Sequence, residues 1–321
     1  MISRISKTYN GLILTLERRV MSAKEKIEEL RDEKDVVIVA HNYQIGDIQD
    51  IADFVGDSFG LAQRVNELDV ANIVFCGVDF MAESAAILNP DKDVIFPETK
   101  AECPMAKMVD LDKLREYKEK NPESAVVSYV NTNAETKAES DVCCTSSNSV
   151  KVVKSLDNEK VLFLPDRNLG HYIKRFVNDK EVDVWEGFCA THDNILPKDM
   201  RRSIQKYPDA EVVVHPECRP EVIDMADHVE STAGILERAR KTESSVMIIG
   251  TEKEMGYRLK KEIPDKEYHF PAEPTCINMK KITLDSVLES IKTKEPIVEV
   301  DEEMAVKAIK PLRRMVDIGR G

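Results

Sequence analysis

Three cysteines divide this chain into nearly equal parts. Cys103, Cys189 and Cys276 are separated by 86 and 87 residues, and each follows a short apolar or aromatic run with acidic neighbours. Two sets of strand-like runs recur at almost the same interval: VVIVAHNY, AVVSYVNT and EVVVHPEC in one set, and NIVFCG, KVLFLP and SVMIIG in the other. A long period with the same features in each copy indicates a repeated supersecondary unit. The sequence therefore predicts three similar units, each supplying one thiol to a shared metal site.

Composition narrows the class of protein. A chain of 321 residues is too long for one ordinary core, and a hydrophobic content of 42% is usual for a globular protein. The net charge of −13 argues against a general nucleic-acid binder, which would present a basic face. No apolar run reaches the ~20 residues that span a bilayer, and the N-terminal region lacks an apolar export signal. We therefore expect a cytoplasmic protein with no nucleic-acid or membrane partner, whose seven cysteines are reduced thiols.

Each unit is predicted to be a three-layer α/β unit. Short strands rich in Val, Ile and Phe are typical of parallel strands buried on both faces, and stretches with helical periodicity lie between them. Strands that alternate with helices indicate a parallel sheet covered by helices. The expected ranges are 1–106 for the first unit, 107–190 for the second, 191–276 for the third, 107–120 and 193–208 for connecting helices, and 277–321 for a helical tail that packs on the assembly. Residues 1–20 fit none of the repeats, and Met21 is an alternative start.

Polar side chains follow the first strand of every unit. They stand at alternate positions and recur at intervals of 88 and 86 residues: His41 and Tyr43, Tyr129 and Asn131, His215 and Glu217. Residues two apart on a strand point to the same face. The carboxyl ends of parallel strands are where α/β folds bind their ligands. These six residues therefore predict a ligand site where the three units meet.

A second threefold set consists of hydroxyl residues before apolar helical stretches. Ser58, Ser146 and the pair Ser231-Thr232 recur at the same intervals and are typical N-cap residues. Helix N-termini also favour anions, by ~0.3–1 kcal/mol where exposed. Each residue taken singly is most simply a cap, but the threefold register favours a common site for a polyanionic small molecule. We expect a packing role for Cys76. For the adjacent Cys143 and Cys144, near the expected helix start at Ser146, packing or incidental helix-start roles are favoured over a redox-sensing thiol.

The three spaced cysteines favour one kind of metal site over others. Structural zinc usually takes four ligands, often from C-x-x-C pairs, and this chain has no such pair. Iron–sulfur clusters that transfer electrons are normally closed by four cysteines. Three cysteines around a four-iron cluster would leave one iron open to substrate. Such an iron acts as a Lewis acid that polarises a hydroxyl or carbonyl group.

These residues lie in segments that strongly resemble the quinolinate synthase family. The resemblance runs from about Met21 to the early three hundreds, and its segments are AHNYQIGDIQDIADFVGDS, FPETKAECPMAKM, VVSYVNTNAETKAESDVCCTSSN, FLPDRNLG, WEGFCATH, HPECRPEV, ESTAGIL and EPTCINM. It implies three similar αβα units around a pseudo-threefold axis, with one [4Fe-4S] cluster held by Cys103, Cys189 and Cys276. It also implies the condensation of iminoaspartate with dihydroxyacetone phosphate to quinolinate, in de novo NAD biosynthesis. An aspartate oxidase or dehydrogenase is expected to supply the iminoaspartate.

The resemblance further implies roles for individual residues. Tyr43 and Glu217 are expected to transfer protons. The expected substrate-binding residues are His41, Ser58, Tyr129, Asn131, Ser146, His215, Glu217 and Thr232. Two other functions remain open at this stage. One is a different three-cysteine [4Fe-4S] dehydratase, which would ignore dihydroxyacetone phosphate. The other is a non-catalytic metal sensor that binds polyanions and does not need Tyr43 or Glu217.

Overall fold

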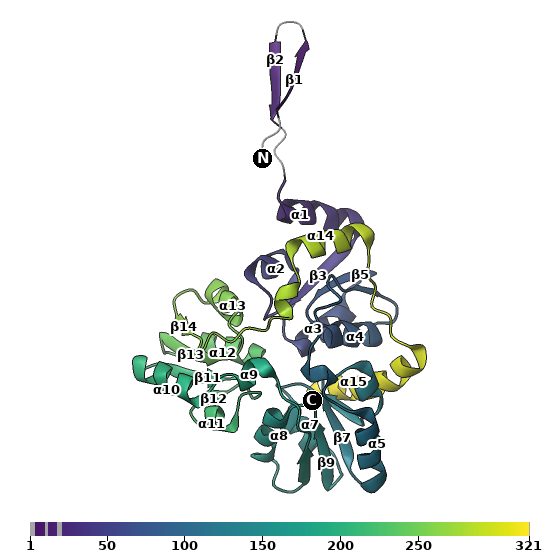
Figure 1. The fold of residues 1–321 in the computed structure, drawn as a ribbon, viewed down its shortest axis with the longest axis vertical. Helices are drawn as coiled ribbons and strands as arrows, with labels where there is room; N and C mark the ends of the chain where they lie inside the picture. Colours follow the sequence, from purple (N-terminus) through teal and green to yellow (C-terminus); the bar gives the residue numbers. More distant parts are fainter. Residues whose placement is uncertain (1–3, 10–11, 18–20, 321) are drawn as a thin grey trace.

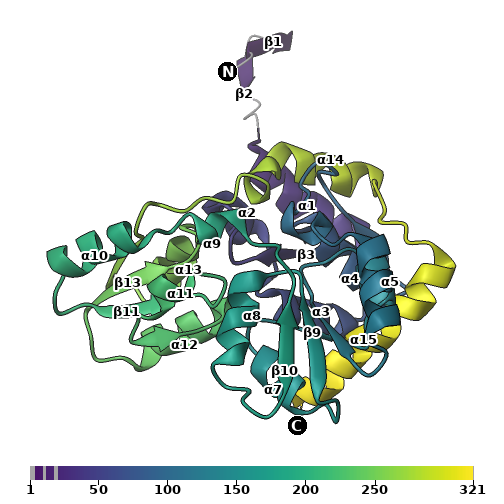
Figure 2. The same ribbon diagram turned by 60° about the horizontal axis from the view of Figure 1, so that its bottom comes forward.

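Three four-stranded parallel sheets form the body of the protein. The computed structural model describes residues 4–9, 12–17 and 21–320. The strand orders are β4-β3-β5-β6, β8-β7-β9-β10 and β12-β11-β13-β14, so each sheet repeats the same topology. Helices cover the sheets, and the three sheets are grouped around one centre (Figures 1 and 2). The predicted class, three similar αβα units with short parallel sheets, is confirmed.

The central strands of each sheet are the apolar runs predicted from the sequence. They are β3 (Val36–His41) and β5 (Asn72–Cys76), β7 (Ala125–Tyr129) and β9 (Lys160–Leu164), and β11 (Glu211–Val214) and β13 (Val246–Gly250). Most of their residues are buried, as Val- and Ile-rich strands covered on both faces require. The third predicted strand of each unit forms one edge of the sheet: β6 (Asp93–Ile95), β10 (Glu181–Val184) and β14 (Glu267–His269).

The other edge of each sheet is a strand of two or three residues that the helical periodicity did not predict. These strands are β4 (Phe54–Gly56), β8 (Val142–Cys144) and β12 (His228–Val229). No strand was predicted at these positions, because two or three residues are too few to show a period of two. Cys143 and Cys144 lie on β8 and are fully buried, and Cys76 is buried on β5, in agreement with the expected packing roles.

The helices complete the three units. In the first unit they are α2 (Gly46–Ile51), α3 (Ser58–Glu67), α4 (Asp79–Leu88) and the 3-10 turn η1 (Met105–Lys107). In the second they are α5 (Leu111–Lys120), α6 (Ala134–Ala138), α7 (Ser149–Lys154) and α8 (Arg167–Lys174). In the third they are α9 (Ala190–Asp193), α10 (Pro197–Lys206), α11 (Pro220–Ile223), α12 (Thr232–Lys241) and α13 (Met255–Glu262). The two predicted connecting helices correspond to α5 and α10.

Two polar contacts recur in all three units. An aspartate accepts the N–H of a strand residue fifteen positions earlier: Asp53 from Ile38, Asp141 from Val126 and Asp227 from Val212, at 2.7–2.9 Å. A lysine donates to two backbone carbonyls 24 and 22 positions earlier: Lys92, Lys180 and Lys266. Neither set was recognised in the sequence, yet both keep the 88- and 86-residue intervals of the polar pairs that begin at His41, Tyr129 and His215. The repetition therefore extends to the contacts that hold each sheet together.

The C-terminal tail packs on the first two units but is not one continuous helix. The 3-10 turn η2 (Met279–Lys281) leads to α14 (Leu284–Thr293), which packs on α1 (Ala23–Lys34), and α15 (Glu302–Arg320) packs on α4, α6 and β8. Between α14 and α15 the chain bonds to the edge of the first sheet, where Val298 N–H donates to Val94 O at 2.8 Å. The predicted helical tail thus consists of two helices joined by a segment that bonds to this sheet edge. The hairpin of β1 (Arg4–Tyr9) and β2 (Leu12–Glu17) stands away from the body (Figure 1).

None of the helices described in 4–9, 12–17 and 21–320 combines the length and apolar character needed to cross a bilayer.

Candidate active site

One cavity of about 340 Å³ lies where the three units meet. Its wall includes the three spaced cysteines, the polar pairs that follow the first strands, and the predicted hydroxyl residues. All twelve predicted site residues line it: His41, Tyr43, Ser58, Cys103, Tyr129, Asn131, Ser146, Cys189, His215, Glu217, Thr232 and Cys276. They meet because all three sheets direct the carboxyl ends of their parallel strands toward this point. The structure thus brings the predicted residues together, while their individual roles remain predictions.

The three cavity cysteines differ from the other four in exposure. Cys103, Cys189 and Cys276 are partly exposed free thiols, whereas the remaining cysteines are buried in the cores of the units. Burial raises the pKa of the Cys103 thiol to about 12, and burial also raises the pKa of Cys189 and Cys276. The negative charges of neighbouring cysteines and carboxylates add to this effect. These thiols therefore remain protonated at neutral pH until a metal displaces their protons.

His41 and His215 are neutral hydrogen-bonding groups in this cavity. Both are buried, and burial, with nearby positive charge, lowers the pKa of each imidazole to about 3. The Nδ1 atom of His41 accepts the Tyr43 N–H at 3.1 Å, and Nδ1 of His215 accepts the Glu217 N–H at 3.4 Å. In a neutral imidazole with Nδ1 as acceptor, the proton is on Nε2. Each ring therefore carries one N–H donor that can bind an anionic ligand.

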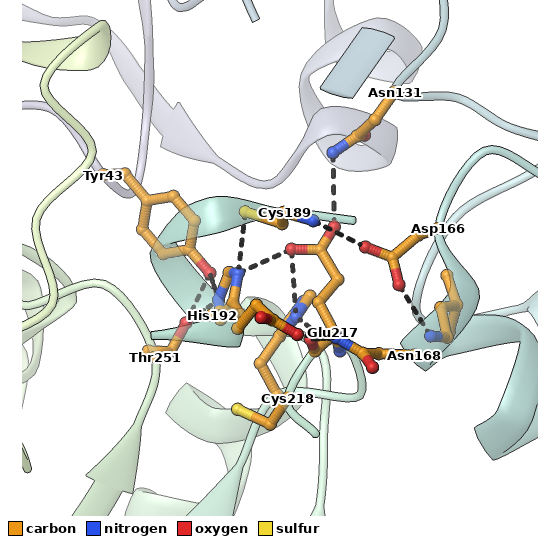
Figure 3. A network of polar contacts seen from close by, with 12 residues as sticks. Tyr43, Asn131, Asp166, Asn168, Cys189, His192, Glu217, Cys218 and Thr251 are labelled. Atoms are coloured by element: carbon orange, nitrogen blue, oxygen red, sulfur yellow. Dashed lines mark hydrogen bonds and ion pairs between the residues drawn. The ribbon is translucent and has the colours of Figure 1, made fainter. Parts of the chain in front are cut away.

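Glu217 lies at the centre of a buried polar network (Figure 3). Its Oε2 atom lies 2.6 Å from His192 Nδ1 and 3.7 Å from His215 Nδ1, and its Oε1 accepts from Asn131 Nδ2 at 3.4 Å. Burial by itself would raise the pKa of Glu217, but the close contact and hydrogen bond with His192, together with His215 and Tyr129, lower it to about 2. The side chain is therefore an ionised carboxylate within hydrogen-bond reach of several proton donors.

A chain of hydrogen bonds links Glu217 to Tyr43 through two residues that the sequence analysis missed. His192 Nε2 lies 2.9 Å from Thr251 Oγ1, which lies 2.5 Å from the Tyr43 hydroxyl (Figure 3). Burial raises the pKa of Tyr43 well above its usual value, so the phenol keeps its proton. The chain has the alternating donors and acceptors that proton transfer requires. The sequence offered one signal, a histidine three residues after Cys189, whereas Thr251 has no distinctive context.

Asn168 connects the Glu217 backbone to a buried cluster of charged residues. Asn168, labelled in Figure 3, donates from Nδ2 to the Glu217 backbone oxygen at 3.0 Å. The same amide donates to Asp193 Oδ1 at 3.1 Å. Asp193 is buried and also pairs with Arg167 at 3.1 Å and Arg219 at 2.6 Å. A buried carboxylate is stable only when paired and hydrogen-bonded, and two guanidinium groups satisfy this condition. Through Asn168, this cluster therefore anchors the backbone at Glu217.

The predicted N-caps are only partly correct. Ser231 caps α12 by accepting the Gly234 N–H at 3.2 Å, but Asp57 rather than Ser58 caps α3, and α7 begins three residues after Ser146. The hydroxyls of Ser58 and Ser146 therefore do not serve as caps. Thr232 is the first residue of α12, and its Oγ1 accepts from Asn42 Nδ2 of the first unit at 2.8 Å. All three hydroxyl residues line the cavity, where they can bind a ligand.

Two metal arrangements can be considered at this cavity. Ligand atoms of Cys189, His192 and Glu217 lie within 4.8 Å of one another, close enough to surround a single ion. However, His192 and Glu217 already satisfy each other at 2.6 Å, so this set needs no ion to explain it. Cys103, Cys189 and Cys276 come from three different units onto one cavity wall. Cys189 Sγ also lies 3.2 Å from His192 Nδ1. Three thiols, one from each unit, fit a sulfur-ligated group better than a single hard cation.

Comparison with known proteins gives consistent results. The family model described as "Quinolinate synthetase A protein" matches residues 25–317. The quinolinate synthase of Thermodesulfovibrio yellowstonii is 47% identical over 296 residues, covering 92% of this chain and 97% of that protein. Those of Methanoregula boonei and Geotalea uraniireducens are both 49% identical, covering 91% and 92% of this chain and 97% and 98% of their own lengths.

The two neutral histidines lead to a prediction about pH. In the folded, metal-free protein, His41 and His215 should stay unprotonated until the pH approaches about 3, whereas the unfolded chain takes up these protons near 6.5. The unfolded state binds more protons between these values, so each histidine removes up to about 1.4 kcal/mol of stability per pH unit as the pH falls below 6.5. Ring-proton NMR titration of histidine-labelled protein, with His41→Gln and His215→Gln variants for assignment, measures this directly.

The urea-unfolded chain is the reference for that titration. Its histidines should all titrate near 6.5, and the signals lost in the two variants should not titrate between pH 8 and 5 in the folded protein. Midpoints near 6.5 for both assigned signals in the folded protein would show that these imidazoles are not neutral buried donors.

Proposed function

Because this chain belongs to the quinolinate synthase family, we propose that it condenses iminoaspartate with dihydroxyacetone phosphate to give quinolinate, phosphate and water. It is an enzyme of NAD biosynthesis. The observation that carries the proposal is the single cavity that collects three thiols, two neutral histidines, two tyrosines and a carboxylate from all three units. A dicarboxylate that is condensed, cyclised and dehydrated needs anion-binding donors and proton-transfer groups side by side, and this cavity provides both.

Quinolinate synthases depend on an iron–sulfur group, and we assign its ligands to Cys103, Cys189 and Cys276. The residues fit such a group because these three thiols are partly exposed on one cavity wall, whereas the other four are buried elsewhere. We propose a [4Fe-4S] cluster, since three protein ligands leave one iron without a cysteine. When bound, that iron supplies Lewis-acid chemistry at a hydroxyl or carbonyl oxygen of the substrate.

Substrate binding is proposed to use the neutral donors of the cavity. The Nε2–H groups of His41 and His215 and the hydroxyls of Ser58, Ser146 and Thr232 can hold carboxylate and phosphate oxygens. The phenol of Tyr129 keeps its proton, because burial raises its pKa well above the usual value. Asn131 Oδ1 is buried and has no hydrogen-bond partner within the described residues, so it can accept a hydrogen bond from a hydroxyl or N–H group of a ligand. Neutral donors bind anions without burying additional charge.

Proton transfer is proposed to use the chain from Glu217 to Tyr43. Glu217 is ionised and can take a proton, while Tyr43 is protonated and can give one. His192 and Thr251 connect the two groups, so a proton lost at one end can be replaced from the other. Imine rearrangement, cyclisation and loss of water each need both an acid and a base. The single hydrogen-bonded chain offers both at the cavity wall.

This chemistry also indicates which enzyme supplies the substrate and in which compartment the reaction takes place. Iminoaspartate is an unstable imine, so an aspartate oxidase or dehydrogenase is the proposed source. We also propose that the enzyme works in the cytoplasm, where its seven free thiols stay reduced. No nucleic-acid or membrane partner is proposed.

The ligand assignment predicts that Cys189→Ser abolishes both iron–sulfur assembly and quinolinate formation. A serine hydroxyl does not ionise at neutral pH and is a poor iron ligand, so removing one of three thiols should prevent assembly. Iron and sulfide content and visible absorbance after anaerobic reconstitution measure assembly. Cys76→Ala is the control, because Cys76 is buried on β5 away from the cavity, and it should assemble normally. An iron-loaded, active Cys189→Ser enzyme would disprove the assignment.

The proton-transfer assignment predicts slow turnover with normal binding. Glu217→Gln should keep the shape of the side chain but lose its ability to take a proton, and its rate should fall by about 10²–10⁴. Tyr43→Phe should fall similarly, because only the hydroxyl is removed. Single-turnover formation of quinolinate under nitrogen measures the rate, and calorimetry measures product binding.

Tyr117→Phe is the matched control for Tyr43→Phe. The Tyr117 hydroxyl donates to Asp183 at 2.6 Å and does not line the cavity, so this variant should turn over normally. Near-normal rates for both Glu217→Gln and Tyr43→Phe would mean that other groups transfer the protons.

A further inference from the structure

The loops that carry the three cysteines are fastened by one repeated pair of hydrogen bonds. In the first bond, the cysteine N–H donates to a carboxylate on the turn after the second strand of the unit. These bonds are Cys103 to Asp79 at 2.8 Å, Cys189 to Asp166 at 3.0 Å and Cys276 to Glu252 at 3.1 Å. In the second bond, the carbonyl two residues before the cysteine accepts an N–H from the same turn, donated by Asp79, Arg167 and Lys253 respectively, at 2.8–3.0 Å. We call each pair of bonds a clamp.

The clamp carboxylates are themselves held in place. Asp79 also accepts the Phe80 N–H at 2.9 Å, Asp166 accepts the Leu169 N–H at 2.8 Å, and Glu252 accepts the Glu254 N–H at 2.9 Å. Each carboxylate therefore connects the beginning of a helix to a cysteine loop. Asp166 and Glu252 are fully buried, and Asp79 is partly buried.

Common ancestry of the units is not a sufficient explanation for the clamps. Burying an ionisable carboxylate costs free energy, and a backbone N–H can be satisfied by a neutral carbonyl instead. The third carboxylate has also changed from aspartate to glutamate, which is one methylene longer, yet it makes the same bond to Cys276. The cysteines lie outside the strands and helices, so no regular hydrogen-bond ladder fixes their backbone. The clamp supplies that constraint.

We propose that Asp79, Asp166 and Glu252 are positioning residues that orient the three cysteines for metal binding. The inference rests on the proposed function, in which these cysteines hold an iron–sulfur group. Residues that hydrogen-bond to metal ligands, without binding the metal themselves, typically contribute about 10- to 100-fold to metal affinity. The third clamp reaches further, because Lys280 Nζ lies 2.8 Å from Glu252 Oε1 and donates to the Tyr43 backbone oxygen at 2.5 Å. This lysine connects the Cys276 loop to the segment that carries Tyr43.

The test compares two replacements of Asp79, which does not line the cavity. Asp79→Leu removes the acceptor, whereas Asp79→Asn keeps an oxygen that can accept the Cys103 N–H. In reconstituted protein under nitrogen, Asp79→Leu should lose iron to a chelator about 10- to 100-fold faster than the wild type, and Asp79→Asn should stay close to wild type. In the metal-free protein, Asp79→Leu should also accelerate hydrogen exchange of the Cys103 amide.

Asp141→Leu is the control for a general loss of stability. It removes an equivalent bond from an aspartate to a backbone N–H, but on Val126, at the far end of the strand from the cavity. It should accelerate exchange near Val126 while iron retention stays normal. Wild-type iron retention in Asp79→Leu, or equal iron loss in Asp141→Leu, would overturn the inference. If the wild type itself took up no iron, the proposed function would fail, and exchange at Cys103 would still decide whether the clamp exists.

Discussion

The structure depends on three parallel sheets that direct their strands' carboxyl ends toward one point. Parallel strands place loops and helix starts at that end, and three sheets facing each other enclose a cavity lined by all of them. The consequence is a high density of buried ionisable groups. Such groups are stable only when paired or neutral. Here His41 and His215 are neutral, Tyr43 and Tyr129 keep their protons, and the carboxylates bind N–H groups or cations.

The same constraint explains how reactivity is distributed in the cavity. Glu217 keeps its charge because His192, His215 and Tyr129 surround it, whereas burial alone would favour its neutral form. The hydrogen-bonded chain through His192 and Thr251 then connects the Glu217 carboxylate to the neutral Tyr43 hydroxyl. A base and an acid are therefore maintained at the two ends of one network. The three thiols line the same cavity as this network. A substrate held by the neutral donors would therefore contact both the thiols and the acid–base network.

Sequence reasoning predicted those parts of the site that a long period and strand ends can reveal. The cysteines and the pairs beginning at His41, Tyr129 and His215 recur at fixed intervals, so they could be recognised without a structure. The central strands were predicted for the same reason, because buried parallel strands are continuous apolar runs. His192 and Thr251 could not be found this way, since each occurs in one unit and acts through partners distant in the chain. The short edge strands were not predicted, because two or three residues are too few to show an alternating pattern. The caps at Ser58 and Ser146 were mispredicted because Asp57 and Asn148 provide the helix starts instead.

Iron-edge anomalous diffraction from crystals grown without oxygen tests the central claim most directly. The account predicts one strong anomalous peak in the shared cavity, in bonding contact with the sulfur atoms of Cys103, Cys189 and Cys276, and with no ligand from His192 or Glu217. A peak bound instead by Cys189, His192 and Glu217, or the absence of iron from this cavity in active enzyme, would contradict it.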